Sequence, residues 1–170
     1  IDNLNQIASE FSRFAKMPSL KIETVDMLAV IYDTVNMFIH EKTSIKVFTE
    51  IDKAVVDADL SQLRRMFINL IRNAMQAEAT SITIDVKSDH DKFKVNISDN
   101  GKGILDSEKD QIFDENFTTK KQGMGLGLSL AKRFITSIGG EIKLNSSSPT
   151  GTVFEIIFPA KNINVAPKNE

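Results

Sequence analysis

The sequence has no cysteine, only two histidines and no long apolar run. The absence of cysteine excludes disulfides and thiolate metal sites, and it is compatible with a reducing cytoplasm. No apolar stretch reaches the roughly 20 residues that a membrane-spanning helix needs, so we expect no membrane contact by this chain. Neither His40 nor His90 has a carboxylate or hydroxyl at motif spacing, so the sequence predicts no catalytic triad and no histidine-based metal site.

The chain also lacks an excess of charge of either sign. It has 21 Lys plus Arg against 23 Asp plus Glu, which gives a net charge of -2. Without a basic surface, nucleic acid is not an expected partner. A hydrophobic share of 41% in 170 residues is enough for the core of one ordinary domain with an appendage. The chain begins at Ile1 directly in a helical pattern, so we expect it to be a fragment of a longer protein.

Four segments carry apolar residues at steps of three and four, which is the spacing of one helix face. We expect the first helix to end near Met17, because Pro18 disfavours helix in the residue before it. Asp59 is predicted to be the N-cap of the third helix, with Gln62 at capping-box spacing. The four apolar stripes are Leu4, Ile7, Phe11 and Phe14; Leu28, Ile31, Val35, Phe38 and Ile39; Leu60, Leu63, Phe67, Leu70, Ile71 and Ala74; and Leu128, Ala131, Ile135 and Ile138.

Alternating apolar and polar residues predict five strands. Polar residues 88–92 predict a hairpin loop, and a turn around Pro149 and Gly151 joins the last two strands. Residues 105–124 show neither period, and so long a loop in a compact domain is usually functional, often a lid. The strand residues are Ile45, Val47, Thr49 and Ile51; Ile82, Ile84 and Val86; Phe93, Val95 and Ile97; Ile142 and Leu144; and Phe154, Ile156 and Phe158. The order of elements predicts an α/β two-layer sandwich, with one mixed sheet, helices on one of its faces and a preceding N-terminal helix.

Two asparagines, Asn69 and Asn73, lie four residues apart on the third predicted helix. They therefore project from the same helix face. An amide oxygen there could bind Mg²⁺, with phosphate oxygens and waters completing its shell. Taken alone, the pair also fits two solvated or capping amides.

A polar segment, residues 99–103, follows the third predicted strand. Asp99 is fixed at the sheet edge, and the glycines after it allow backbone to approach a ligand closely. Its carboxylate could accept a hydrogen bond from the amino group of adenine. The alternative is an ordinary turn, for which Asp-Asn-Gly is a common sequence.

Three glycines, Gly123, Gly125 and Gly127, precede the fourth predicted helix. Amides at a glycine-rich helix N-terminus form a natural phosphate site. Neither the dinucleotide-binding fingerprint nor the P-loop pattern is present. Lys120 before the glycines could neutralise phosphate charge, or it could simply be solvated.

These three segments and the predicted lid, in this order, resemble the catalytic and ATP-binding domain of sensor histidine kinases. That domain belongs to the superfamily shared with gyrase-type, chaperone and MutL ATPases, which have the Bergerat-type fold. The resembling motifs are the N box (residues 69–77), the first glycine box (99–104), the F box (112–120), the second glycine box (123–129) and the closing Gly151-Thr152.

The resemblance implies a Mg-ATP site. It makes Asn73 the Mg²⁺ ligand and Asp99 the acceptor for the adenine amino group, while Phe113 and Phe117 fix the lid. The implied nucleotide-binding residues are Asn69, Asn73, Asp99, Gly101, Gly103, Ile104, Phe117, Lys120, Gly123, Gly125, Leu126, Gly127, Leu128 and Thr152. Two positions depart from the family pattern, which often has a basic residue at Gln76 and a small hydroxyl residue at Met124, and the backbone contacts to phosphate that the resemblance implies do not depend on either side chain.

The same resemblance divides the chain into three parts. Residues 1–18 are similar to the end of the second helix of the dimerisation and phosphoacceptor hairpin, especially that of nitrogen-regulation-type sensors. Residues 19–159 form the catalytic domain, and residues 160–170 are expected to be a flexible tail. The phosphoaccepting histidine is absent from this chain, so autophosphorylation is not expected.

The implied function is transfer of the γ-phosphoryl group of ATP to a histidine on the phosphoacceptor helix of a homodimeric parent. A response regulator receiver domain then accepts the phosphoryl group on an aspartate. Family habit places the parent in the inner membrane, with this part in the cytoplasm. The alternatives are an ATPase of the same superfamily, a serine kinase of the anti-sigma type and a binding module with a vestigial pocket. The ATPases carry a glutamate where this chain has Asn69, and an amide cannot act as a general base for water.

Overall fold

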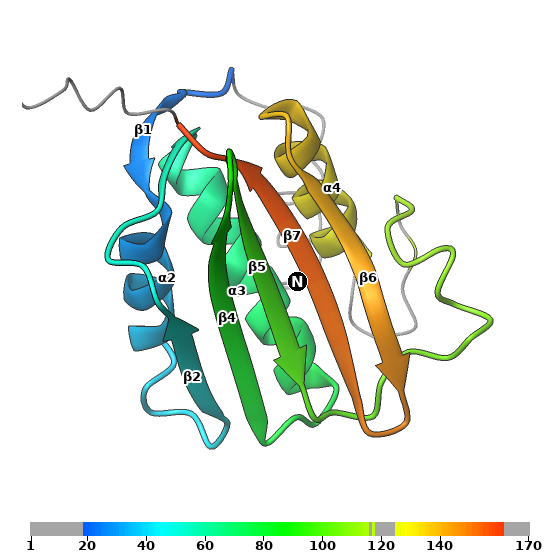
Figure 1. Ribbon diagram of the computed structural model, residues 1–170. Coiled ribbons are helices and arrows are strands. Elements are labelled where there is room, and N and C mark those ends of the chain that lie inside the picture. Colours follow the sequence, from blue (N-terminus) through cyan, green and yellow to red (C-terminus); the bar gives the residue numbers. More distant parts are fainter. Residues whose placement is uncertain (1–18, 116, 118–124, 162–170) are drawn as a thin grey trace, which may run out of the picture.

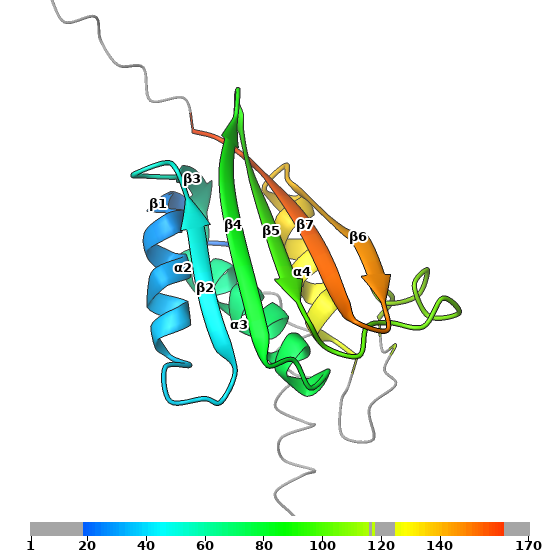
Figure 2. The same ribbon diagram turned by 60° about the horizontal axis from the view of Figure 1, so that its bottom comes forward.

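Among the residues that the structure describes, one mixed sheet of five strands forms the body, with helices on one of its faces (Figures 1 and 2). The structure is a computed structural model, and it describes residues 19–115, 117 and 125–161. The strand order is β2 (Ser44–Thr49), β4 (Ser81–Asp89), β5 (Lys92–Asp99), β7 (Gly151–Pro159) and β6 (Glu141–Ser148). The pair β2 and β4 is parallel, and the other pairs are antiparallel. The predicted two-layer α/β sandwich is confirmed.

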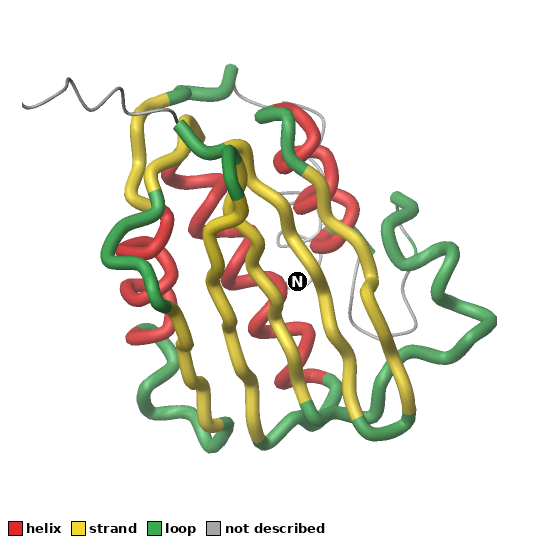
Figure 3. Tube along the Cα trace, viewed as in Figure 1, coloured by secondary structure: helices red, strands yellow, loops and turns green. Residues whose placement is uncertain are grey.

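The helix layer consists of α2 (Met27–Asn36), α3 (Leu60–Gln76) and α4 (Gly127–Ser137), drawn in red behind the yellow strands in Figure 3. Alternate sheet residues such as Ile84 and Ile156 are fully buried beneath these helices. Phe67 of α3 stacks on Phe158 of β7, with ring centroids 6.3 Å apart. The core therefore lies between α3 and the central strands, and it fixes the position of α3 across the sheet.

A small antiparallel sheet of β1 (Glu23–Asp26) and β3 (Val55–Ala58) was not predicted. Each strand has only four residues, which is too short for a clear alternation. The second predicted helix ends at Asn36, earlier than expected, and Ile39 of its predicted stripe is 71% exposed. The predicted hairpin loop 88–92 is also shorter than expected, because β4 extends to Asp89 and β5 begins at Lys92.

The predictions for the two ends of the chain have different outcomes. The first helix and its stripe lie outside the described residues. Ala160 and Lys161, which we placed in the flexible tail, are hydrogen bonded to the body through their backbone amides, to Asp91 O at 2.8 Å and to Val55 O at 2.9 Å. The Lys161 ammonium also contacts Asp57 at 2.7 Å.

Asp59 is the N-cap of α3, as predicted. Its Oδ1 accepts hydrogen bonds from Ser61 N at 3.0 Å and Gln62 N at 3.1 Å, which satisfies amides that have no partner within the helix. Its Oδ2 accepts from Lys21 N at 2.9 Å, so the same carboxylate ties the segment before β1 to the start of α3.

We expect Asp59→Ala to lower the free energy of unfolding by about 1 to 2 kcal/mol, because three backbone donors lose their acceptor. Urea unfolding followed by circular dichroism measures this loss. Asp33→Ala is the control, since Asp33 makes an exposed ion pair with Arg64 at 3.6 Å, and such a pair contributes little. Equal losses in the two variants would contradict the capping role.

Candidate nucleotide site

The second half of α3 carries the two predicted asparagines, and both are half-buried. Gly127, the first residue of α4, lies against Asn69. A Cβ atom built on Gly127 would lie 3.7 Å from Asn69 Cγ, which is ordinary van der Waals contact. The packing of α4 on α3 therefore brings the second glycine box to the asparagine face.

The first glycine box meets the other end of the same helix. Lys102 N donates to Ala77 O, directly after α3, at 2.9 Å. A Cβ atom on Gly101 would lie 2.6 Å from that oxygen, so only glycine fits there without displacing backbone. Asn100 also fixes the box, because its Oδ1 accepts hydrogen bonds from the amides of Thr80 and Ser81, both at 2.9 Å.

Asp99 is the last residue of β5 and is half-buried. Burial raises the pKa of its carboxyl above the ordinary 3.8, against the lowering effect of hydrogen bonds from the backbone amides of Gly101 and Thr152. Gly101 N donates to Oδ1 at 2.8 Å. The carboxylate is thus held in one orientation at the end of the sheet.

The β6–β7 hairpin closes the site beside Asp99. Thr152 of β7 pairs with Asp99 across the ladder and is 4% exposed. Ser147 of β6 pairs with Thr152, and its hydroxyl accepts a hydrogen bond from Ile104 N at 2.8 Å. Ile104 itself packs against the core. The hairpin therefore contacts both ends of the first glycine box.

The start of α4 follows Gly125, which has a φ of 66°. Leu126 occupies the N-cap position and has no polar side chain with which to satisfy the first amides of the helix. Its carbonyl oxygen accepts from Ser129 Oγ at 3.1 Å. Leu126 therefore leaves the first amides of α4, from Gly127 onward, without a capping side chain. These amides lie at the helix end that favours an anion.

Aromatic residues fix the segment between the two glycine boxes. Phe113 makes an edge contact with Phe154 of β7, with centroids 6.2 Å apart, and Lys132 of α4 lies 5.3 Å from the Phe113 ring centroid. Ile112 is buried, and Phe117 packs against the core. Arg133 of α4 pairs with Glu115 at 3.4 Å. The part of the predicted lid that the structure describes is therefore packed against β7 and α4 at this point.

The described motif residues form a strip along α3. Asp99 and Gly101 lie at the Ala77 end, Gly127 lies at the Asn69 end, and Asn73 lies between them, while Gly103 lies against the β6–β7 hairpin. The distance from Asn69 to Ala77 is about 12 Å along the helix axis, at 1.5 Å per residue. Lys120 and Gly123 lie outside the described residues. Sequence analysis assigned no role to Asn100, although it lies within the first glycine box, and it did not identify Lys109 or Ser147, which belong to no expected motif.

Among the residues that the structure describes, no three His, Cys, Asp or Glu side chains are grouped closely enough to hold a metal ion. The side chains near the strip that could supply an oxygen ligand to a metal ion are the amides of Asn69 and Asn73. One amide oxygen with phosphate oxygens and water is the kind of shell that suits Mg²⁺. In the same described part, no helix has both the length and the apolar composition that crossing a membrane requires.

Comparison with known proteins assigns the family. Residues 58–162 match the family model of histidine kinase-, DNA gyrase B- and HSP90-like ATPases, which is more than half of the chain. The chain belongs to this family, and the resemblance to the catalytic, ATP-binding domain of sensor histidine kinases is confirmed.

Individual relatives agree with this assignment. The sensor histidine kinase ZraS of Salmonella typhimurium is 33% identical over 165 residues, which cover 93% of this chain but only 36% of ZraS. The catalytic domain of histidine kinase ThkA has a TM-score of 0.73 and 28% identity, and the match covers 82% of this chain and 96% of that domain. ThkA in complex with the response regulator protein TrrA has the same fold, with a TM-score of 0.78 and 24% identity over 94% of this chain and 48% of that one.

Proposed function

We propose that this chain binds Mg-ATP along the α3 strip and presents its γ-phosphoryl group to a histidine on a separate phosphoacceptor helix. The observation that carries this proposal is the pair of contacts that join three distant motifs on one helix. Gly101 lies against Ala77, and Gly127 lies against Asn69. A ligand with a base at one end and phosphates at the other fits such a strip.

Each part of the strip has a role in this proposal. Asp99 accepts a hydrogen bond from the adenine amino group, while Gly101, Gly103, Ile104 and Thr152 shape the base pocket. The amides of residues 125–128 bind phosphate, and Asn69 lies beside them. Asn73 supplies an amide oxygen to Mg²⁺, which neutralises charge on the phosphate oxygens when it is bound.

In the proposed transfer, a ring nitrogen of the acceptor histidine forms a bond to the γ-phosphorus. The bond between that phosphorus and the β–γ bridging oxygen breaks, and ADP leaves. This chain contributes positioning and charge neutralisation, which are the main protein contributions to phosphoryl transfer. An aspartate of a response regulator receiver domain is the proposed final acceptor, by analogy with the ThkA–TrrA pair.

The proposed parent is a homodimeric sensor kinase in which residues 1–18 belong to the phosphoacceptor hairpin. ZraS, of which the chain matches only 36%, is a sensor histidine kinase with room for such a hairpin. The cytoplasmic side of a membrane sensor is the proposed location of this domain.

Calorimetric titration of ATP into the 170-residue chain tests the proposal, in Mg²⁺ and again in excess EDTA. We expect binding in Mg²⁺, with slow phosphate release. Asn73→Ala should raise the Kd about tenfold in Mg²⁺, as expected for loss of a charge-assisted interaction, and should match the parent chain in EDTA. Asn36→Ala is the control, because Asn36 is exposed at the end of α2.

The outcomes separate the candidate functions. Absence of ATP binding by the parent chain would contradict the proposal. Rapid phosphate release would support the ATPase alternative instead. If Asn73→Ala raised the Kd for ATP equally with and without Mg²⁺, Asn73 would not be a Mg²⁺ ligand.

A further inference from the structure

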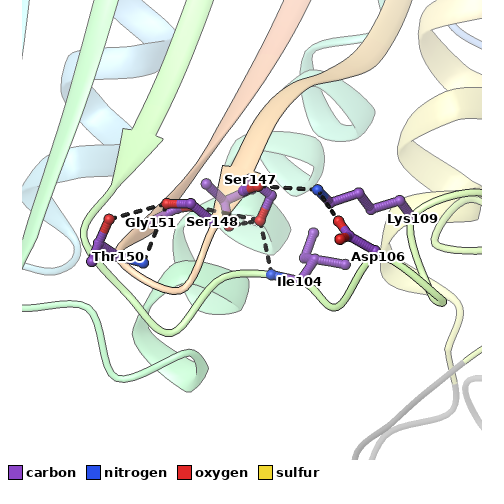
Figure 4. Close-up of polar contacts among 8 residues, drawn as sticks. Ile104, Asp106, Lys109, Ser147, Ser148, Thr150 and Gly151 are labelled. Atoms are coloured by element: carbon purple, nitrogen blue, oxygen red, sulfur yellow. Dashed lines mark hydrogen bonds and ion pairs between the residues drawn. The ribbon is translucent and has the colours of Figure 1, made fainter.

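We propose that Ser147 and Lys109 are positioning residues of the nucleotide site. Together they hold residues 104–109 against the β6–β7 hairpin (Figure 4). We call these two hydrogen bonds, both to Ser147, the hairpin clamp. The inference rests on the proposed function, since it concerns how the base end of the ATP site keeps its shape.

The Ser147 hydroxyl is the first half of the hairpin clamp. It accepts from Ile104 N at 2.8 Å and lies 3.3 Å from Thr152 Oγ1. A hydroxyl has two lone pairs and one proton, so it can accept from Ile104 and still donate once. Ser147 therefore connects the amide at the end of the first glycine box to Thr152, whose neighbour across the ladder is Asp99.

The Ser147 carbonyl is the second half. Lys109 Nζ donates to this oxygen at 3.0 Å and contacts Asp106 Oδ1 at 2.6 Å. Asp106 is 95% exposed, so its ion pair with Lys109 contributes little by itself. The bond to the carbonyl is different, because it joins residue 109 to the same residue that holds residue 104. One residue of β6 thus fixes both ends of the segment.

A bulge in β6 makes this arrangement possible. Leu144 pairs with Phe154, and the register then shifts, so that Ser147 pairs with Thr152. In a regular ladder residue 146 would be opposite Thr152, and Ser147 would face the other side of the sheet. Because paired residues share a face, the bulge turns the Ser147 side chain to the side of Thr152 and the site.

The hairpin clamp matters for the site because Gly103 fits closely against the hairpin. A Cβ atom on Gly103 would overlap the Ser148 carbonyl oxygen, so the glycine box and the hairpin meet backbone to backbone. A small outward movement of the hairpin would open this contact. The hairpin clamp opposes that movement, and it acts within one residue of Gly103.

The test compares nucleotide affinity and stability in matched serine variants. Ser147→Ala should raise the Kd for Mg-ATP about fivefold, the value expected for loss of one net hydrogen bond. Ser147→Thr keeps the hydroxyl and should bind within about twofold of the parent chain. The control is Ser146→Ala, which removes an exposed serine hydroxyl from the same strand and should leave the Kd unchanged.

Lys109→Met tests the second half of the hairpin clamp, the bond from Lys109 to the Ser147 carbonyl oxygen. Lys109→Arg is the conservative variant, which keeps the positive charge. We expect Lys109→Met to raise the Kd for Mg-ATP about twofold to fivefold and Lys109→Arg to restore it. All affinities are measured at a temperature where circular dichroism shows each variant to be folded. A purely structural residue would lower the melting temperature without changing these affinities.

Base selectivity supplies a second readout. The hairpin clamp acts at the adenine end, so Ser147→Ala should lower the ratio of ATP to GTP affinity, whereas general loosening would weaken both nucleotides alike. Unchanged ATP affinity in Ser147→Ala, with binding by the parent chain, would overturn this inference alone. Absence of ATP binding by the parent chain would overturn the proposed function as well.

Discussion

Asp99→Asn is expected to raise the Kd for ATP on the order of 100-fold while leaving the folded state intact. The adenine amino group is a donor and needs an acceptor. An amide side chain has only one acceptor oxygen, and Gly101 N already donates to Oδ1 at 2.8 Å. The amide nitrogen of the substituted side chain would then face the ligand as a second donor, and neither group would have a partner.

The folded state of Asp99→Asn is expected to be about as stable as that of the parent chain. Burial raises the pKa of Asp99, so its ionised form costs stability at every pH above the folded pKa. An uncharged amide avoids that cost and still accepts one backbone hydrogen bond. We therefore expect the free energy of unfolding at pH 7 to change by less than about 1 kcal/mol.

The sign of the pH dependence follows from the same shift. The cost of the ionised carboxylate is complete above the raised pKa and disappears as the pH falls toward 3.8. The stability of the parent chain relative to Asp99→Asn should therefore improve on acidification through this interval. Urea unfolding at a series of pH values measures the difference. Asp99→Ala is the comparison, because it also removes the acceptor for Gly101 N. ATP binding by Asp99→Asn at the affinity of the parent chain would exclude Asp99 as the adenine acceptor.

Much of this fold is encoded locally, and those parts were predictable. The stripe of α3 and its Asp59 cap lie within a few residues of each other, and the capping bonds at 3.0 and 3.1 Å confirm the predicted start. Alternation placed β4, β5, β6 and β7, whose buried faces cover the core. In contrast, β1 and β3 depend on pairing between Glu23 and Ala58, which are far apart in the sequence and show no local pattern.

The sequence allowed part of the candidate site to be predicted, and its role in nucleotide binding stays a prediction. Asn73, Asp99, Gly101 and Gly127 lie along α3 because each motif has a fixed place in the order of elements. Ser147 could not be assigned in this way, since serine is common in hairpins and its orientation depends on a bulge. Lys109 is a lysine in an irregular loop, and only its 3.0 Å contact with a carbonyl oxygen distinguishes it from a solvated one.

Two glycines of the predicted site should respond in opposite ways to alanine. Gly103 has a φ of 72°, a conformation that costs a non-glycine residue about 1 to 2 kcal/mol, and its added Cβ would overlap the Ser148 carbonyl oxygen. That oxygen belongs to backbone and cannot move as a flexible side chain could. We expect Gly103→Ala to lower the free energy of unfolding by about 2 to 3 kcal/mol and to weaken ATP binding in parallel.

Gly127→Ala is the matched control, because the nearest described atom to its added Cβ would be Asn69 Cγ at 3.7 Å. Alanine is the better helix former by about 1 kcal/mol, so stability should be unchanged or higher. Urea unfolding of the two variants measures the contrast. If glycine is needed at residue 103 for its fit against the hairpin, the hairpin clamp is already open in Gly103→Ala. Ser147→Ala should then lower the free energy of unfolding less in the Gly103→Ala background than it does in the parent chain. Full additivity of the two losses would mean that Ser147 and Gly103 act independently.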